Sequence, residues 1–259
     1  MKRMAVVLLW LGLAGGLLAA CATPAKQVAE EREALAHRRL GEAYLRDGNF
    51  QAARVELQKS IRLNPEDKEA HYLLGLVYDR GLGQLQAALE AYQEALRLDP
   101  EYSEAHNALG GLYGKMGRWE DAIQAFQRAL KNPLYREPAP AHFNLGLAYY
   151  HLKRYDEAMA AFADAIRVDP AYLDPRMWRG ITLYEQGKDR EAIDELGRVL
   201  RLNPRYPDAY RVYYDLGLAY LRLGQKADAE KAFRQTVELA PRSDLARSAQ
   251  RYLSQLRAP

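Results

Sequence analysis

The side chain best suited to covalent chemistry is the thiol of Cys21, the only cysteine among 259 residues. A thiol can serve as a nucleophile or a metal ligand, but one cysteine cannot form an intrachain disulfide or a site with several thiolate ligands. No catalytic pattern accompanies it, because the sequence contains no glycine-rich phosphate loop, no Gly-x-Ser-x-Gly and no His-Glu-x-x-His. We therefore expect a protein that is not an enzyme and that uses no cofactor, no metal and no small-molecule substrate.

The sequence before Cys21 is typical of a secretory signal. Lys2 and Arg3 form a short basic start, and residues 4–18 are apolar or glycine. This run is too short for a membrane-spanning helix, and no stop-transfer sequence follows it. It ends in Leu18-Ala19-Ala20-Cys21, where the small alanines suit a signal peptidase. We expect residues 1–20 to be a signal peptide.

The Leu-Ala-Ala-Cys ending resembles the bacterial lipobox, and this resemblance implies lipidation of Cys21. In lipoproteins the thiol is alkylated with diacylglycerol, the chain is cut before the cysteine, and the new amino group is acylated. Several acyl chains, at about 0.8 kcal/mol for each buried CH₂ group, anchor a protein firmly in a membrane. Residues 21–33 would then form a lipidated tether, with the alternative that its end runs into the first helix. The alternative is an ordinary signal peptide followed by a chance cysteine.

The rest of the chain is nearly neutral. Loss of Lys2 and Arg3 with the signal peptide lowers the formal charge from +3 to +1. Nucleic-acid binding depends on a concentrated basic face, so we expect no nucleic-acid partner. Eighteen tyrosines against five phenylalanines favour half-buried surfaces and protein interfaces, because a tyrosine ring keeps one polar end.

The chain after the tether is periodic. A glycine that follows leucine and precedes tyrosine by three residues recurs at steps of 34, 35, 36, 34 and 37 residues, with one weaker copy: Leu40-Gly41…Tyr44, Leu74-Gly75…Tyr78, Leu109-Gly110…Tyr113, Leu145-Gly146…Tyr149, Arg179-Gly180…Leu183 and Leu216-Gly217…Tyr220. Each unit closes on a proline, at Pro65, Pro100, Pro133, Pro170, Pro204 and Pro241. These residues resemble the tetratricopeptide repeat family, whose period is about 34 residues.

The period predicts an all-α fold. Each unit holds two stretches with apolar residues at helical spacing, which indicates a helix pair, and one pair cannot bury its own apolar face. The resemblance implies a right-handed superhelical solenoid of six tetratricopeptide helix pairs over residues 34–242. Residues 243–259 predict one more helix, a cap that closes the stack, with Leu245, Ala249 and Tyr252 on its apolar stripe.

Glycines recur in the turn between the two helices of a unit, at Gly48, Gly83, Gly117, Gly187 and Gly224. Left-handed backbone costs glycine little, so Lys153, which takes this place in the fourth unit, should be mildly strained or capped differently. The second unit has one extra residue near Arg80 to Gly83. Three prolines in residues 133–140 predict an irregular joint after the third unit.

Four histidines occupy one position of successive units, four residues before the glycine: His37, His71, His106 and His142. Such a ladder suggests a metal array, but equivalent residues of neighbouring units lie about 8–10 Å or more apart. Metal–nitrogen bonds are only about 2 Å long. The sixth unit has Tyr213 at this position, which favours a bulky, half-buried structural residue instead.

The first helix of each repeat lines the concave groove in this family. Its groove-facing positions lie three residues before, one after and four after the glycine. The first three units are mostly polar or small there, including Arg38 and Glu42, whereas the last three are wholly apolar or aromatic. An exposed apolar stripe of this length favours binding of a protein segment. The candidate groove residues are Tyr72, Leu76, Phe143, Leu147, Tyr150, Met177, Ile181, Tyr184, Tyr214, Leu218 and Leu221. The alternative is that a tight superhelix buries part of this stripe.

A lipobox, six repeats and a capping helix together resemble the outer-membrane pilotin family of type IV pilus biogenesis, which includes a social-gliding-motility lipoprotein. The most specific element is Asn132-Pro133-Leu134-Tyr135, followed by Asn144-Leu145-Gly146. The resemblance implies a periplasm-facing, outer-membrane lipoprotein that binds secretin subunits and promotes their localisation and multimerisation. Ala22 after the cysteine, rather than aspartate, fits outer-membrane sorting as known in enteric bacteria. The fifth repeat departs from the family pattern, because it has Arg179 where leucine is usual.

Two other classes of protein share some of these features. A general periplasmic scaffold lipoprotein, serving peptidoglycan enzymes or polysaccharide export, would have the same repeats. An enzyme with an unrecognised site is disfavoured, because the groove positions offer no nucleophile and no paired acid and base.

Overall fold

The computed structural model describes residues 24–257, so Cys21 and the predicted signal peptide lie outside the described residues. Within that range the chain contains thirteen α-helices, one π-helical segment and no β-strand. In chain order these are α1 (Pro24–Arg46), α2 (Phe50–Leu63), α3 (Lys68–Leu76), η1 (Val77–Gly81), α4 (Leu85–Leu98), α5 (Ser103–Lys115), α6 (Trp119–Lys131), α7 (Pro138–His151), α8 (Tyr155–Val168), α9 (Asp174–Glu185), α10 (Asp189–Leu202), α11 (Ala209–Arg222), α12 (Lys226–Leu239) and α13 (Asp244–Arg257). None of the described helices is long and apolar enough to cross a membrane.

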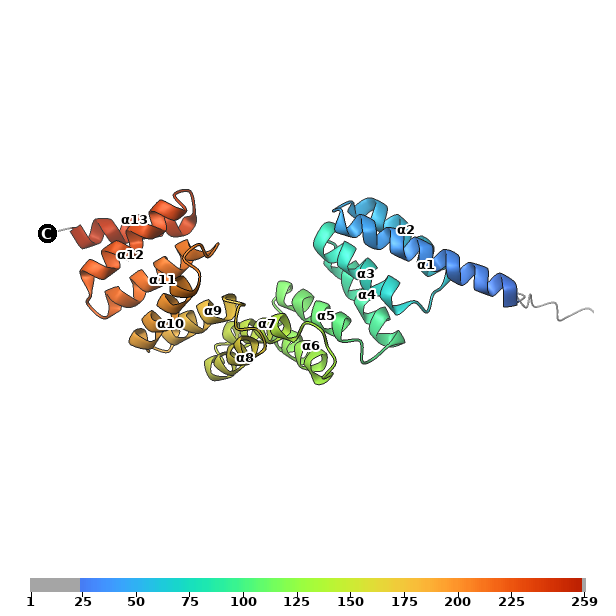
Figure 1. Cartoon of the computed structure of the whole chain (residues 1–259), viewed down its shortest axis with the longest axis horizontal. Helices are drawn as coiled ribbons and strands as arrows, with labels where there is room; N and C mark the ends of the chain where they lie inside the picture. Colours follow the sequence, from blue (N-terminus) through green and yellow to red (C-terminus); the bar gives the residue numbers. More distant parts are fainter. Residues whose placement is uncertain (1–23, 258–259) are drawn as a thin grey trace, which may run out of the picture.

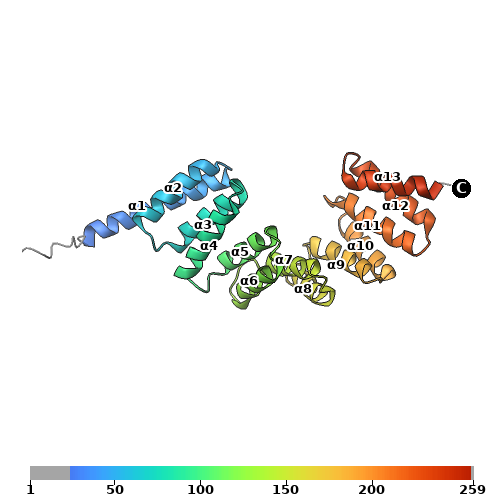
Figure 2. The same cartoon turned by 180° about the vertical axis from the view of Figure 1, so that it is seen from behind.

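Consecutive helices pack as pairs, from α1 with α2 to α11 with α12, and α13 packs against α12. The pairs follow one another along an open arch, in which α5, α7, α9 and α11 lie on the inner side (Figure 1). The view from behind gives the same arrangement (Figure 2). The predicted all-α solenoid of six helix pairs with a C-terminal capping helix is therefore confirmed.

The repeated glycines let the two helices of a pair approach closely. At Gly75 a Cβ atom would lie 2.5 Å from two ring carbons of Tyr92, which is fully buried. At Gly217 it would lie 2.5 Å from a ring carbon of Phe233, also fully buried. The glycine and the large side chain thus form one packing unit, which explains why both recur with the same period.

The turns within the pairs have the predicted backbone. Gly48, Gly117 and Gly224 have φ values of 74°, 73° and 74°, in the left-handed region. Lys153 has φ 58° and is the one non-glycine residue with positive φ in the described chain. A side chain in this conformation costs roughly 1–2 kcal/mol, so the predicted strain at Lys153 is present.

The turns between repeats share a hydrogen-bonded geometry of their own. The side-chain oxygen of an Asn or Asp accepts a hydrogen bond from the backbone N–H two residues later, at 2.9–3.2 Å, in Asn64, Asp99, Asn132, Asp169 and Asn203. This is the Asx-turn geometry that these residues favour. The joint after the third unit begins in the same way at Asn132, and its extra residues are followed by α7, which begins at Pro138.

Two sequence expectations need correction. Helix α1 begins at Pro24, so residues 24–33, expected to be a tether, extend the first helix of the first repeat. The extra residue of the second unit does not lengthen a turn but forms the π-helix η1, in which the N–H of Leu82 bonds the carbonyl of Val77. The π-helix lets Gly81 lie against the ring of Phe50, where a Cβ atom would overlap it.

Candidate protein-binding surface

The eleven predicted groove residues fall into two groups. Seven are half-buried: Tyr72, Leu147, Tyr150, Tyr184, Tyr214, Leu218 and Leu221. Four are buried in the core, with 3–9 % of their surface exposed: Leu76, Phe143, Met177 and Ile181. The expected continuous exposed stripe is therefore interrupted, and these four residues do not offer a binding surface.

The turns between repeats explain the burial of Phe143 and Met177. After the fourth and fifth repeats, the Asx turn ends in a tyrosine that covers the position three residues before the preceding glycine. The ring centroid of Tyr172 lies 5.3 Å from that of Phe143, and the hydroxyl of Tyr206 lies 3.9 Å from the sulfur of Met177. This position therefore belongs to the joint between repeats, which the spacing of groove positions on a single helix does not show.

The accessible part of the inner face centres on Tyr150 of α7. Its ring lies 5.2 Å from that of Trp178 at 74° and 5.8 Å from that of Tyr155. The guanidinium carbon of Arg211 lies 5.2 Å from the centroid of the Trp178 ring, within the range of a cation–π interaction. Three first helices, α7, α9 and α11, thus contribute to one aromatic cluster.

Charged groups border this cluster. Asp215 of α11 has a side-chain oxygen, Oδ2, that is shut off from solvent and has no hydrogen-bond partner. Burial raises the pKa of Asp215 to about 7, the charge of Glu185 adds to this effect, and Arg211 opposes it. Burial, followed by the charge of Glu185, raises the pKa of Tyr150 to about 12, so its hydroxyl keeps its proton at neutral pH.

A neighbouring ion pair fixes Tyr184, the predicted groove residue of α9. The guanidinium of Arg222 lies 3.8 Å from the centroid of the Tyr184 ring, and its Nε donates to both carboxylate oxygens of Asp189 at 2.7 and 2.8 Å. Arg222 belongs to the sixth repeat and Asp189 to the fifth, so this pair ties the two repeats together beside the inner face.

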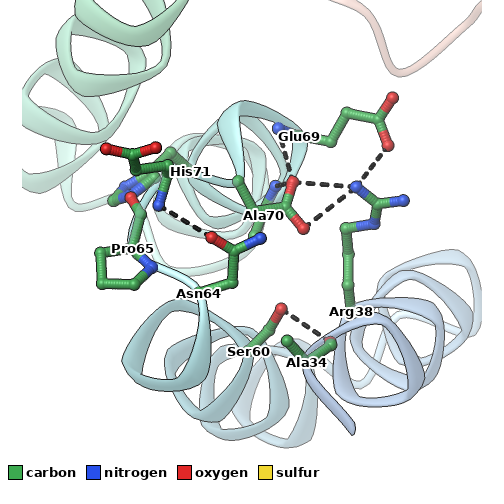
Figure 3. A network of polar contacts seen from close by, with 10 residues as sticks. Ala34, Arg38, Ser60, Asn64, Pro65, Glu69, Ala70 and His71 are labelled. Carbon is green, nitrogen blue, oxygen red and sulfur yellow. Dashed lines mark hydrogen bonds and ion pairs between the residues drawn. The ribbon is translucent and has the colours of Figure 1, made fainter. Parts of the chain in front are cut away.

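The N-terminal end of the surface is polar, as expected. Arg38 donates to the carboxylate of Asp67 at 2.8 and 3.0 Å. It also pairs with Glu69 at 2.7 Å (Figure 3). In the same region the hydroxyl of Ser60 donates to the carbonyl of Ala34 at 2.8 Å (Figure 3). The Arg38 contacts join the first repeat to the second, whereas the Ser60 bond joins the two helices of the first repeat. Arg38 is therefore engaged in structure rather than free for a ligand.

The histidine ladder has structural partners. The Nε2 atoms of His71 and His106 donate to the carbonyls of Pro65 and Pro100 at 2.9 and 2.8 Å, which links each repeat to the previous one. Burial lowers the pKa of His106, so it stays neutral at pH 7. Among the described residues, no group of three or more His, Cys, Asp and Glu side chains could hold a metal ion.

In the first and fifth repeats, the residue four before the glycine has a glutamate as its partner. The Nδ1 atom of His37 lies 2.6 Å from Glu56, and the fifth repeat has Arg176 in place of the histidine, 3.6 Å from Glu195. Arg179, the departure noted in the sequence, also pairs with Glu195, at 2.8 Å. Both repeats therefore combine a basic residue with a glutamate on the second helix.

Sequence reasoning missed Trp178, Glu185, Arg211 and Asp215. A signal was available, because Arg211, Asp215 and Leu218 are spaced by four and three residues and so share one helix face. The position two residues before the glycine was not counted as part of the groove.

A family model described as "Tetratricopeptide repeat" matches residues 25–61, 38–103, 107–172 and 179–244, and a second model with the same description matches residues 80–133. These matches cover most of the chain and correspond to the helix pairs of the structure.

Individual proteins are also similar. The "Type IV pilus assembly protein PilF" of Pseudomonas aeruginosa is 31% identical over 143 residues, which are 55% of this chain and 56% of that protein. The chain thus aligns with about half the length of this curated relative. The solved structure from work on P. aeruginosa pilF has a TM-score of 0.74 at 23% identity, covering 86% of this chain and 99% of that one. The structure of "PilW, widely conserved type IV pilus biogenesis factor" has a TM-score of 0.76 at 18% identity, covering 84% and 98%. At these identities the two structures show a shared fold.

Proposed function

Because the chain belongs to the tetratricopeptide repeat family, we propose that it is a non-catalytic protein-binding scaffold that acts in type IV pilus biogenesis. The observation that carries the pilus assignment is the 31% identity to a type IV pilus assembly protein over 143 residues. The two pilus-related structures that share the fold over more than four-fifths of the chain are consistent with it.

The more specific proposal concerns the binding partner and the cellular location of the protein. The protein binds subunits of the secretin, the outer-membrane pore of the pilus, and promotes their localisation and multimerisation. Lipid on Cys21 holds it at the outer membrane, facing the periplasm. The lipobox-like sequence before Cys21 supports this anchoring.

The binding surface we propose is the accessible part of the inner face over repeats four to six. It comprises the half-buried residues Leu147, Tyr150, Tyr184 and Leu218, together with Trp178. Half-buried aromatic side chains suit a protein interface, because they offer a large contact area with little loss of conformational freedom.

The first experiment is a gene deletion in the source organism, followed by electrophoresis of outer-membrane fractions under conditions that preserve heat- and detergent-resistant secretin multimers. We expect the multimer to disappear while secretin monomer remains. An unchanged multimer would reject the pilus role and favour a scaffold for another envelope machine, such as peptidoglycan synthesis or polysaccharide export.

Point variants then test the surface and the anchor. Leu147→Asp with Leu218→Asp should abolish recovery of secretin in crosslinking pull-downs while the helical circular dichroism signal is kept. Ile181 is unsuitable for such a test, because a charge at this buried position would unfold the protein. Cys21→Ser should leave the repeats folded but release the protein from the outer-membrane fraction; persistence there would contradict the lipid anchor.

A further inference from the structure

Asp215 differs from the other largely buried carboxylates of the chain. Those side chains each face a cation at 2.7–2.8 Å: Asp67 faces Arg38, Asp79 faces Lys115, Asp189 faces Arg222 and Glu195 faces Arg179. In three of these four pairs the cation comes from a neighbouring repeat. The buried Oδ2 of Asp215 has no hydrogen-bond partner among the described residues.

The fold itself does not require an acid at this position. The equivalent residues of the other five repeats, two before the glycine, are Arg39, Leu73, Ala108, Asn144 and Trp178. None of them is acidic. An unpaired buried carboxylate destabilises a protein, and groups perturbed in this way are enriched at functional sites.

The surroundings of Asp215 suit a positive charge. Glu185 acts on it electrostatically from α9, and both carboxylates also act on the hydroxyl of Tyr150. The ring faces of Tyr150 and Trp178 attract cations, as the guanidinium of Arg211 over Trp178 demonstrates within the chain. When Asp215 is ionised, two carboxylates against one arginine leave this cluster with an excess negative charge that one cationic side chain would neutralise.

We propose that the cluster of Tyr150, Trp178, Glu185, Arg211 and Asp215 receives a lysine or arginine side chain of the protein partner. Asp215 and Glu185 accept its hydrogen bonds, and the aromatic rings pack against its methylene stem. This inference rests on the proposed scaffold function and specifies the chemistry of its partner. This surface would therefore prefer a positively charged ligand, whereas a clamp of basic side chains prefers the negatively charged carboxylate at a chain terminus.

The test does not depend on the natural partner. The full-length protein, purified in detergent, is used to select binders from a phage library of random dodecapeptides. We expect the selected peptides to share a lysine or arginine at one fixed position. Replacement of that residue by norleucine, or of Asp215 by asparagine, should weaken binding of the synthetic peptide by at least about tenfold, the effect typical of a charged hydrogen bond.

Two controls separate this effect from folding and from general charge. Asp194→Asn removes an exposed carboxylate from the second helix of the fifth repeat and should leave the dissociation constant unchanged. The affinity of the wild-type protein should rise from about pH 6 to about pH 8, because only ionised Asp215 attracts the cation, and Asp215→Asn should remove this rise. The charges that face Asp215 are those of Arg211 on its own helix and Glu185 on α9.

Selected peptides without a fixed basic residue would overturn the proposal, and so would a failure to select any peptide. A basic residue whose replacement is equally harmful in the wild-type protein and in the Asp215→Asn variant would also overturn it, because the cation would then bind elsewhere. A positive selection together with an unchanged secretin multimer would retain the cation site and reject only the pilus role.

Discussion

Replacement of Asp215 by asparagine should stabilise the protein above neutral pH. The folded structure raises the pKa of this carboxyl from an ordinary 3.8 to about 7, chiefly through burial. At about 1.4 kcal/mol for each pKa unit, the difference corresponds to roughly 4 kcal/mol as an upper bound. A neutral amide of the same shape carries no such penalty, so Asp215→Asn should recover much of this free energy of unfolding.

The sign of the effect follows from the proton balance. Below about pH 4 the carboxyl is protonated in both the folded and the unfolded chain, so ionisation contributes nothing. Between about pH 4 and 7 the unfolded chain loses the proton while the folded chain keeps it, so wild-type stability falls as the pH rises. Above about pH 7 both states are ionised and the full penalty applies.

Urea denaturation of the wild-type protein and the variant, followed by circular dichroism at several pH values, measures this difference. The stabilisation by Asp215→Asn should be near zero at about pH 4 and reach a few kcal/mol at about pH 8, with similar slopes against urea for both proteins. Asp194→Asn, at an exposed site, should change stability little at either pH. If the free energies of unfolding of the wild type and Asp215→Asn differed by a constant amount across this pH range, the Asp215 carboxylate would not carry the burial cost that we infer.

Three further substitutions test other parts of the fold by the same denaturation assay. Lys153→Gly should stabilise the protein by about 1 kcal/mol, because φ is 58° there; an unchanged or lower midpoint would contradict strain at this turn. Gly75→Ala should destabilise by about 1–3 kcal/mol, because the new Cβ would lie 2.5 Å from the buried ring of Tyr92, and a neutral effect would refute the close approach. Arg222→Ala should cost about 1–3 kcal/mol, less than a fully buried pair since Arg222 is partly exposed, and Asp189→Asn added to it should recover part of the loss.

The repeat architecture could be predicted from the sequence because its constraints are local and repeated. The contact of Gly75 with Tyr92 lies within one helix pair, and the left-handed turn at Gly48 lies within a few residues. Each such requirement restricts the residue type at one position and recurs with the period of the fold. The extra residue of the second unit could be seen in the sequence, but its π-helical form could not. The π-helix lies against Phe50 of the preceding repeat, a contact that the sequence of the second unit alone does not contain.

The binding surface could be predicted only in part, because exposure depends on how neighbouring repeats meet. Leu147 and Ile181 occupy the same position of successive repeats, yet Leu147 is half-buried and Ile181 is buried in the core. The missing hydrogen-bond partner of the Asp215 Oδ2 atom has the same origin, because it depends on which side chains the neighbouring helices present there. A sequence pattern identifies which face a residue lies on, but not which neighbour it meets.

The unpaired carboxylate links stability to binding. A cationic side chain that pairs with Asp215 favours its ionised form, so binding recovers the free energy that ionisation costs the unbound protein. The increase in melting temperature on binding a basic peptide should therefore be larger at about pH 8 than at about pH 5, provided the peptide is equally saturating at both. The other buried carboxylates already face cations within the chain, so their variants should not produce this pH dependence. An equal thermal shift at both pH values would separate the stability cost of Asp215 from partner recognition and leave the cost without a functional explanation.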